Sequence, residues 1–214
     1  MAEARAALAH QFDDLEQQKQ AATLGMWVFL VTEVLFFGGL FACYVVYRLS
    51  YPEAWTEASH ELDILLGGFN TAVLICSSLT MALAVQGAQL GRRRMLIVFL
   101  LLTIALGGVF LGVKAVEYHH KYVESHVPGP GFSFHGPHAR EAQLFFALYF
   151  AMTGMHALHM VVGVGLLLNL VRQGMRGRFS PDYYTPVEMV GLYWHFVDIV
   201  WIFLFPLLYL LGRH

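Results

Sequence analysis

The sequence predicts an all-α integral membrane protein, built as a bundle of five transmembrane helices. Hydrophobic residues make up 57% of the 214 positions and charged residues only 13%, against roughly 25% charged residues in soluble domains. Five apolar runs each exceed the roughly 20 residues that a helix needs to cross a hydrocarbon core about 30 Å thick. None alternates polar and apolar residues as barrel strands do, and helices satisfy their own backbone hydrogen bonds, as lipid requires.

The apolar runs divide the chain into an arm, a bundle and one long loop. We expect the bundle at residues 24–211, with spans at about residues 24–47, 64–85, 95–116, 143–170 and 187–211. Residues 1–23 are then an N-terminal arm, either a short surface helix or a frayed segment. The acidic residues Asp13, Asp14 and Glu16 distinguish this arm from a signal peptide. The long loop, residues 117–142, contains VPGPGFSFHGPH, whose Pro and Gly interrupt regular structure.

The basic residues predict which side of the membrane each end occupies, because cytoplasmic loops carry more Lys and Arg. With the N-terminus cytoplasmic and the C-terminus outside, the cytoplasmic segments hold Arg5, Lys19, Arg92, Arg93, Arg94, Arg172, Arg176 and Arg178. The outside segments then hold Arg48, Lys121, Arg140 and Arg213. This imbalance favours that orientation, with the 117–142 loop outside.

Composition also narrows the classes of function. The net charge of -2 gives no basis for nucleic-acid binding. Cys43 and Cys76 lie in apolar runs without a CxxC pattern, so neither a disulfide framework nor a zinc ribbon is predicted. No span carries the continuous polar stripe that a water-filled pore would need.

Ionisable residues inside the spans are the most informative, because an Asp at mid-bilayer costs about 2.5–3.5 kcal/mol on insertion scales. The membrane-buried polar residues are Glu33, His156, His159, His195 and Asp198. At a rise of about 1.5 Å per residue, all of them fall in the middle third of the membrane. His156 and His159 are three residues apart, as are His195 and Asp198, so each pair shares a helix face. We expect Asp198 to accept hydrogen bonds from His195 or from a neighbouring helix.

Three interpretations of these residues remain open on the residues alone. Histidines and carboxylates build metal and haem sites in helix bundles, and His156 with His195 is the candidate pair for haem ligation. A di-iron centre is disfavoured, because no span contains Glu-x-x-His. Intramembrane ionisable residues also mark proton paths and transporters, although the sequence has no repeats or broken helices typical of transporters. The third interpretation, slightly preferred, is a structural polar cluster that fixes helix register and contacts lipid headgroups or a partner.

Other residues in the spans are interpreted as packing and anchoring groups. The second span is rich in Gly, Ala, Ser and Thr, and the third contains the GxxxG pair Gly108 and Gly112. Small residues of this kind predict close helix packing in membranes. Trp27, Trp194 and Trp201 are interpreted as lipid or interface anchors.

The outside loop and the residues before it are rich in histidine. Imidazole suits copper, so copper capture is one interpretation, but the irregular spacing favours an exposed Gly- and Pro-rich loop. The histidines concerned are His119, His120, His126, His135 and His138.

Four segments of the chain resemble subunit III of the haem-copper oxidases. The last span contains YWHFVDIVWIFLFPLLYLLG, similar to that family's closing helix, with aromatic-Trp-His-Phe, then Asp, then Val-Trp. The fourth contains YFAMTGMHALHMVVGVGLLL, which resembles the family's Thr-Gly-x-His-x-x-His segment. The first contains WVFLVTEVLFFGGLFACY, which resembles the helix with a membrane-buried Glu before Leu-Phe-Phe. The third ends in FLGVKAVEYHH, with the helix-end polar residues Glu117 and Tyr118 in the matching places.

The resemblance implies a subunit of a respiratory terminal oxidase in the bacterial inner membrane, which reduces dioxygen to water and pumps protons. Haem and copper then belong to partner subunits I and II, and this chain has no catalytic, cofactor-binding or metal-ligating residues of its own. Its implied work is to pack on subunit I, bind phospholipid and sustain proton uptake and catalytic lifetime. The family's carbodiimide-reactive carboxylate maps onto Glu33, and a larger respiratory supercomplex is a further possible partner.

Alternatives remain within and outside this family. The VTEVLFF and YWHF segments look closer to the cytochrome c type, while quinol oxidases and nitric oxide reductase-associated relatives share the outline. The chain resembles the five-helix bacterial type, which lacks two N-terminal helices of the mitochondrial type. In the mitochondrial type these two helices form one wall of a lipid-filled cleft. In this protein that wall is either supplied by a partner chain or absent. A free-standing haem-binding membrane protein, with His156 and His195 as ligands, is the rival from another class.

Overall fold

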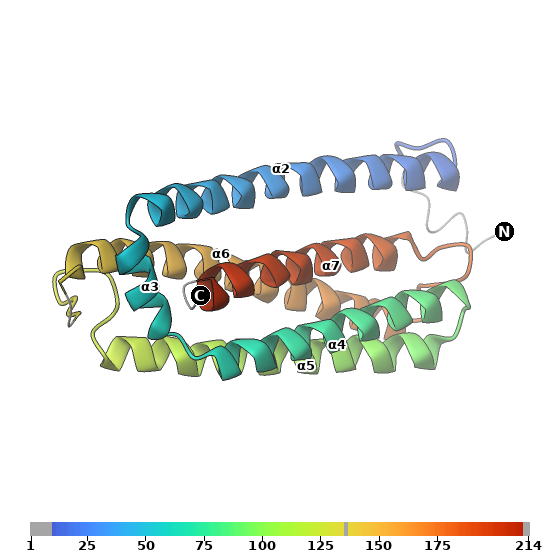
Figure 1. Cartoon of the computed structure of the whole chain (residues 1–214). Helices are drawn as coiled ribbons and strands as arrows, with labels where there is room; N and C mark the ends of the chain where they lie inside the picture. Colours follow the sequence, from blue (N-terminus) through green and yellow to red (C-terminus); the bar gives the residue numbers. More distant parts are fainter. Residues whose placement is uncertain (1–9, 135–136, 212–214) are drawn as a thin grey trace.

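Five long helices, running alternately in opposite directions, make up most of the computed structural model, which describes residues 10–134 and 137–211 (Figure 1). They are α2 (Leu15–Ser50), α4 (Ile64–Gln89), α5 (Arg93–Val123), α6 (Ala139–Met175) and α7 (Thr185–Phe205). Each is long and apolar enough to cross a membrane, and the described residues form no strand beyond an isolated bridge. The predicted all-α membrane bundle is therefore confirmed. Arg5, His135 and Arg213 lie outside the described residues.

The helices extend beyond the apolar runs because polar residues cap or continue them. Helix α2 starts at Leu15, inside the segment predicted as an arm, where the Asp14 carboxylate accepts a hydrogen bond from the Gln17 backbone N–H at 2.7 Å. The Asp63 carboxylate caps α4 in the same way. Helix α5 continues to Val123, well past its apolar run, so that the connection to α6 is shorter than the predicted loop.

A short helix, α3 (Pro52–His60), lies across one end of the bundle and was not predicted from the sequence (Figure 1). Its Trp55 is buried and packs edge-on against Tyr44 of α2 and Phe145 of α6. This aromatic contact attaches α3 to both helices. We refer to this end of the molecule, which also holds the α5–α6 loop, as the α3 end.

The last helix widens at a proline. Pro206 has no backbone N–H to donate, and from it the chain forms a π-helical turn, η1 (Pro206–Leu210), closed by a 3.1 Å hydrogen bond from the Leu211 N–H to the Pro206 carbonyl. The turn carries Tyr209 into the core, where it is fully buried.

Helices α4 to α7 pack tightly through glycines and tryptophans. A Cβ at Gly107 of α5, or at Gly163 of α6, would lie 2.9 Å from the Trp194 ring. Trp194 and Trp201 are both fully buried, and their indole N–H groups donate to hydroxyls on α4 at 3.0 and 3.1 Å. The prediction that these two residues are lipid or interface anchors is wrong, whereas Trp27 is 55% exposed.

The GxxxG pair does not form a helix contact. A Cβ at Gly108 or Gly112 would meet nothing within 4 Å. Sequence spacing identified a small-residue stripe but not its direction, and the orientation of α5 turns Gly107, the glycine beside that stripe, toward Trp194.

Helix α2 stands apart from the other four (Figure 1). In the most apolar 18-residue stretch of α2, only 17% is buried inside the molecule. The corresponding share for the last span, Thr185–Leu210, is 50%. Near its start, the Lys19 ammonium lies 5.7 Å from the centre of the Tyr184 ring. Near its end, the Tyr44 hydroxyl and the Arg48 guanidinium donate to carbonyls of Leu207 and Leu211.

Candidate functional site

The five membrane-buried polar residues predicted from the sequence occupy three separate places. Glu33 of α2 and His159 of α6 contact each other at the wall of a cleft. His195 and Asp198 of α7 line a groove against α4. His156 lies alone in the core between aromatic rings.

Glu33 and His159 form a close polar pair between α2 and α6. Glu33 Oε2 lies 3.1 Å from His159 Nε2, and the two side chains are 19% and 14% exposed. The other ring nitrogen, Nδ1, lies 2.8 Å from the Met155 carbonyl oxygen. The ring of Phe37, one helical turn beyond Glu33, packs 5.4 Å from the imidazole centre.

These contacts define how many protons the pair holds. A carbonyl oxygen only accepts, so His159 Nδ1 must carry a hydrogen, and Nε2 of the neutral ring is an acceptor. The contact between Nε2 and Glu33 therefore needs one further hydrogen between the two atoms. Either Glu33 Oε2 or His159 Nε2 can be the donor of this hydrogen bond.

The Glu33–His159 pair opens into an apolar cleft between α2 and the α6–α7 pair. The cleft has a volume of about 390 Å³ and is lined mainly by apolar side chains, including Met26, Phe29 and Val162. Tyr193 of α7 closes one side and donates a 2.9 Å hydrogen bond to the His159 carbonyl. The polar pair is thus held at the wall of a space that suits hydrocarbon chains.

A second groove, of about 470 Å³, lies between α4 and α7 and contains His195 and Asp198. The Ser78 hydroxyl is 2.8 Å from His195 Nδ1. Ser78 also lies near Asp198, yet neither carboxylate oxygen of Asp198 has a hydrogen bond of standard geometry in the described part of the chain. The expected hydrogen bond from His195 to Asp198 is therefore not formed, because the imidazole turns toward α4.

His156 is buried and packs against two aromatic rings. Its ring centre lies 5.3 Å from those of Phe110 and Trp201, and neither ring nitrogen finds a hydrogen-bond partner among residues 10–134 and 137–211. His195 has different neighbours, in the α4 groove. The geometry thus gives no support to these two imidazoles as a facing pair of haem ligands.

The sequence analysis missed a buried ion pair on α5. The Lys114 ammonium lies 3.0 Å from Glu117 Oε2 and donates to the hydroxyls of Tyr149 and Tyr209 at 3.1 and 3.0 Å. Both hydroxyls donate in turn to Glu117 Oε1. We call these four residues the Lys114 cluster.

The environment of the Lys114 cluster is aromatic and closed. Lys114 and Glu117 are each only 3% exposed, and the ammonium lies 5.2 Å from the Trp201 ring. Glu117 and Tyr118, predicted as helix-end residues, lie inside α5, and the Tyr118 hydroxyl is 2.6 Å from that of Thr153. The signal in the sequence was the i, i+3 spacing of Lys114 and Glu117. It was overlooked because the third span was expected to end at about residue 116, before Glu117.

Comparison with known proteins identifies the family. Residues 9–213 match the family described as cytochrome c oxidase subunit III. The chain belongs to this family. It is 33% identical to cytochrome c oxidase subunit 3 of Thermostichus vulcanus over 202 residues, which cover 94% of this chain and 92% of that protein. It is 31% identical to cytochrome bo(3) ubiquinol oxidase subunit 3 of Pseudomonas aeruginosa over 205 residues, covering 96% and 92%. A probable quinol oxidase subunit 3 of Staphylococcus haemolyticus is 29% identical over 206 residues, covering 94% of each chain.

Membership of the cytochrome c oxidase subunit III family confirms the predicted resemblance. It makes the chain part of an oxidoreductase complex of the haem-copper oxidase class. Together with the five long apolar helices and the bacterial relatives, it identifies a multi-pass protein of the bacterial inner membrane.

Proposed function

We propose that this chain is the non-redox subunit III of a proton-pumping terminal oxidase that reduces dioxygen to water with electrons from cytochrome c. In this proposal the haems and copper belong to subunits I and II, and this chain packs on subunit I. The match to a cytochrome c oxidase subunit 3 over 92% of that protein supports the assignment. The family match over residues 9–213 supports the place in the complex.

The observation that carries the role of this subunit is the Glu33–His159 contact of 3.1 Å at the wall of an apolar cleft. A pair that shares one proton can accept a second proton or release its own with little rearrangement, because the acceptor and donor atoms are already in place. We infer that the pair buffers protons for uptake by the oxidase. This keeps the enzyme supplied with protons during rapid turnover and extends its catalytic lifetime.

The cleft around the pair is proposed to hold phospholipid. Its walls are apolar side chains of α2, α6 and α7, and its volume of about 390 Å³ accommodates part of an acyl chain. A bound chain would cover the apolar face that α2 leaves open and exclude water from the polar pair, which strengthens the Glu33–His159 interaction in a low-dielectric medium.

The test uses the complete purified oxidase with Glu33→Gln or His159→Gln. Each variant removes the shared titratable proton but keeps a hydrogen-bonding amide at the site. We expect the initial rate of oxygen consumption to stay close to wild type, and the number of turnovers before inactivation to fall several-fold. His195→Gln, which changes a half-buried histidine in the other groove, is the matched control. Unchanged lifetimes in both test variants, or an equal loss in the control, would contradict the proposed role.

A quinol donor is the second candidate, supported by the relatives from Pseudomonas aeruginosa and Staphylococcus haemolyticus named above. The same purified complex, supplied in turn with reduced cytochrome c and with ubiquinol, separates the two donors. Oxygen uptake driven only by ubiquinol would replace the cytochrome c assignment. It would leave the role of the Glu33–His159 pair unchanged.

A further inference from the structure

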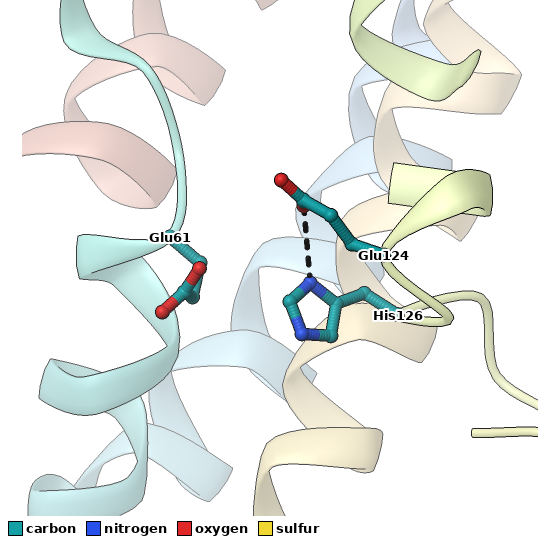
Figure 2. A group of neighbouring side chains, drawn as sticks. All are labelled: Glu61, Glu124 and His126. Atoms are coloured by element: carbon teal, nitrogen blue, oxygen red, sulfur yellow. Dashed lines mark ion pairs between the residues drawn. The ribbon is translucent and has the colours of Figure 1, made fainter. Parts of the chain in front are cut away.

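Two glutamates and a histidine from separate segments converge at the α3 end of the molecule (Figure 2). Glu61 follows the last residue of α3, Glu124 follows the last residue of α5, and His126 lies two residues further in the α5–α6 loop. One ligand atom from each lies within 4.8 Å of the others. Figure 2 shows the His126 ring between the two carboxylates, with one nitrogen directed at Glu124 and the other on the side of Glu61.

The imidazole of His126 is fixed in place. It stacks on the Phe146 ring with centres 5.0 Å apart and planes 16° apart, and Phe132 and Phe134 pack beside it. The side chain is only 12% exposed, and Nδ1 lies 3.3 Å from Glu124 Oε2. Nδ1 is shielded from solvent and makes no hydrogen bond of standard geometry within the described residues. Stacking therefore holds the ring with Nδ1 facing the Glu124 carboxylate, an arrangement in which an ion could lie between the two.

The backbone presents Glu124 and His126 to the same space. Ser125 between them has φ of 57°, a left-handed conformation uncommon for residues other than glycine. The His126 N–H donates to the Lys121 carbonyl at 2.9 Å, which closes the turn. Residues held in such conformations cost free energy, so the surrounding contacts must define this turn firmly.

The carboxylates of Glu61 and Glu124 outnumber the ammonium groups beside them, so the cluster of Glu61, Glu124 and His126 is negatively charged. The Lys121 ammonium lies 2.5 Å from Glu124 Oε2 and offsets one carboxylate, while Glu61 has no ion pair within 4.0 Å in residues 10–134 and 137–211. Burial, with Lys121 next, lowers the pKa of His126 below its usual value. Burial would raise the pKa of Glu124, but Lys121 and His126 hold that pKa below its usual value. Two carboxylates thus face a single ammonium in this group, which favours a cation.

We propose that Glu61, Glu124 and His126 bind one divalent transition-metal ion of the Zn²⁺ type, with water completing its coordination. An imidazole nitrogen with carboxylate oxygens suits zinc, whereas Ca²⁺ and Mg²⁺ favour all-oxygen sets. Tetrahedral ligands at about 2.1 Å from an ion lie about 3.4 Å apart, so small side-chain rotations would close the present spacing of up to 4.8 Å. Such an ion would join α3 to the α5–α6 loop.

The test measures zinc in the complete oxidase complex. The complex is treated with a chelator, equilibrated with buffered Zn²⁺, and assayed for zinc relative to haem iron. Against the wild type, Glu61→Gln and His126→Gln should each weaken one zinc site at least about 100-fold, because even outer partners of a metal ligand contribute about 10–100-fold. Glu53→Gln, which changes another exposed glutamate of α3, should leave zinc binding unchanged.

Two further measurements distinguish a metal site from a network of ion pairs without metal. Lys121→Met removes the ammonium that competes for Glu124 and should tighten zinc binding about tenfold, since a like charge near the ion disfavours it. Zinc-edge absorption should report one nitrogen ligand at about 2.0–2.1 Å that is lost in His126→Gln. Equal zinc content in wild type, Glu61→Gln and His126→Gln, or displacement of the zinc by Ca²⁺ at similar concentration, would overturn the proposal.

Discussion

The Lys114 cluster and the Glu33–His159 pair are both polar groups buried in a membrane protein, but they are built in opposite ways. Every charge of the Lys114 cluster has several partners, from α5, α6 and η1, inside a closed aromatic shell. Glu33 and His159 bond mainly to each other at the wall of a cleft, and Glu33 belongs to α2, the least buried of the five long helices in the described residues.

We infer from this difference that the Lys114 cluster serves stability and the Glu33–His159 pair serves the proposed function. Removing one member of the Lys114 cluster leaves several buried partners unsatisfied. The Glu33–His159 pair has one contact between its members and an open side, so a change there disturbs fewer neighbours. Three ways to test this distinction follow, from the largest expected effect to the smallest.

The largest effect is expected for Lys114→Met. The substitution leaves the Glu117 carboxylate buried beside two tyrosines without its counter-charge, and breaking a buried pair costs about 3–5 kcal/mol. Unfolding of the detergent-solubilised complex with increasing SDS, followed by loss of this chain from the complex, measures the change. The double variant Lys114→Met with Glu117→Gln should cost less than the single variant. A larger cost for the double variant would show that the cluster is held by packing rather than by charge pairing.

An intermediate effect is expected for Gly107→Ala. Its Cβ would lie 2.9 Å from the fully buried Trp194 ring, and overpacking of this kind costs about 1–3 kcal/mol. Gly38→Ala on α2, where a Cβ meets nothing within 4 Å, is the matched control and should be neutral or slightly stabilising. The SDS midpoint of each variant measures the difference. Equal destabilisation by the two would mean that α2 is packed as tightly as α5.

The smallest effect on stability is expected for Glu33→Gln. The amide can still donate to His159 Nε2, so the free energy of unfolding should change by less than about 1 kcal/mol. The same SDS titration, run beside Lys114→Met, gives the comparison. A loss as large as that of Lys114→Met would place the Glu33–His159 pair in the structural class.

The spans could be predicted from the sequence because hydropathy and length alone decide what crosses a bilayer. The contacts between side chains on different helices could not be predicted, because they depend on how each helix is rotated about its axis. Glu33 contacts His159, 126 residues away, whereas His156, three residues before His159, points into the core. Lys114 was passed over because its apolar run ends close by, whereas α5 continues to Val123 and places Lys114 inside the bundle. Helix α3 is too short and polar to register as a span, although Pro52 at its start and its buried face of Ala54, Trp55 and Ala58 were signals of an amphipathic helix. The π turn begins at Pro206.

The position of α2 has a consequence for anyone who purifies this subunit. Its polar contacts lie at Lys19 near one end, at Tyr44 and Arg48 near the other, and at Glu33 between them. Between these points only one face of α2 meets protein, chiefly through Phe37, which is buried against Phe196 of α7. The opposite face of α2 leaves apolar side chains such as Leu24, Leu35 and Leu49 exposed. We therefore expect detergent that strips lipid to loosen α2 before it affects helices α4 to α7, which retain their internal contacts.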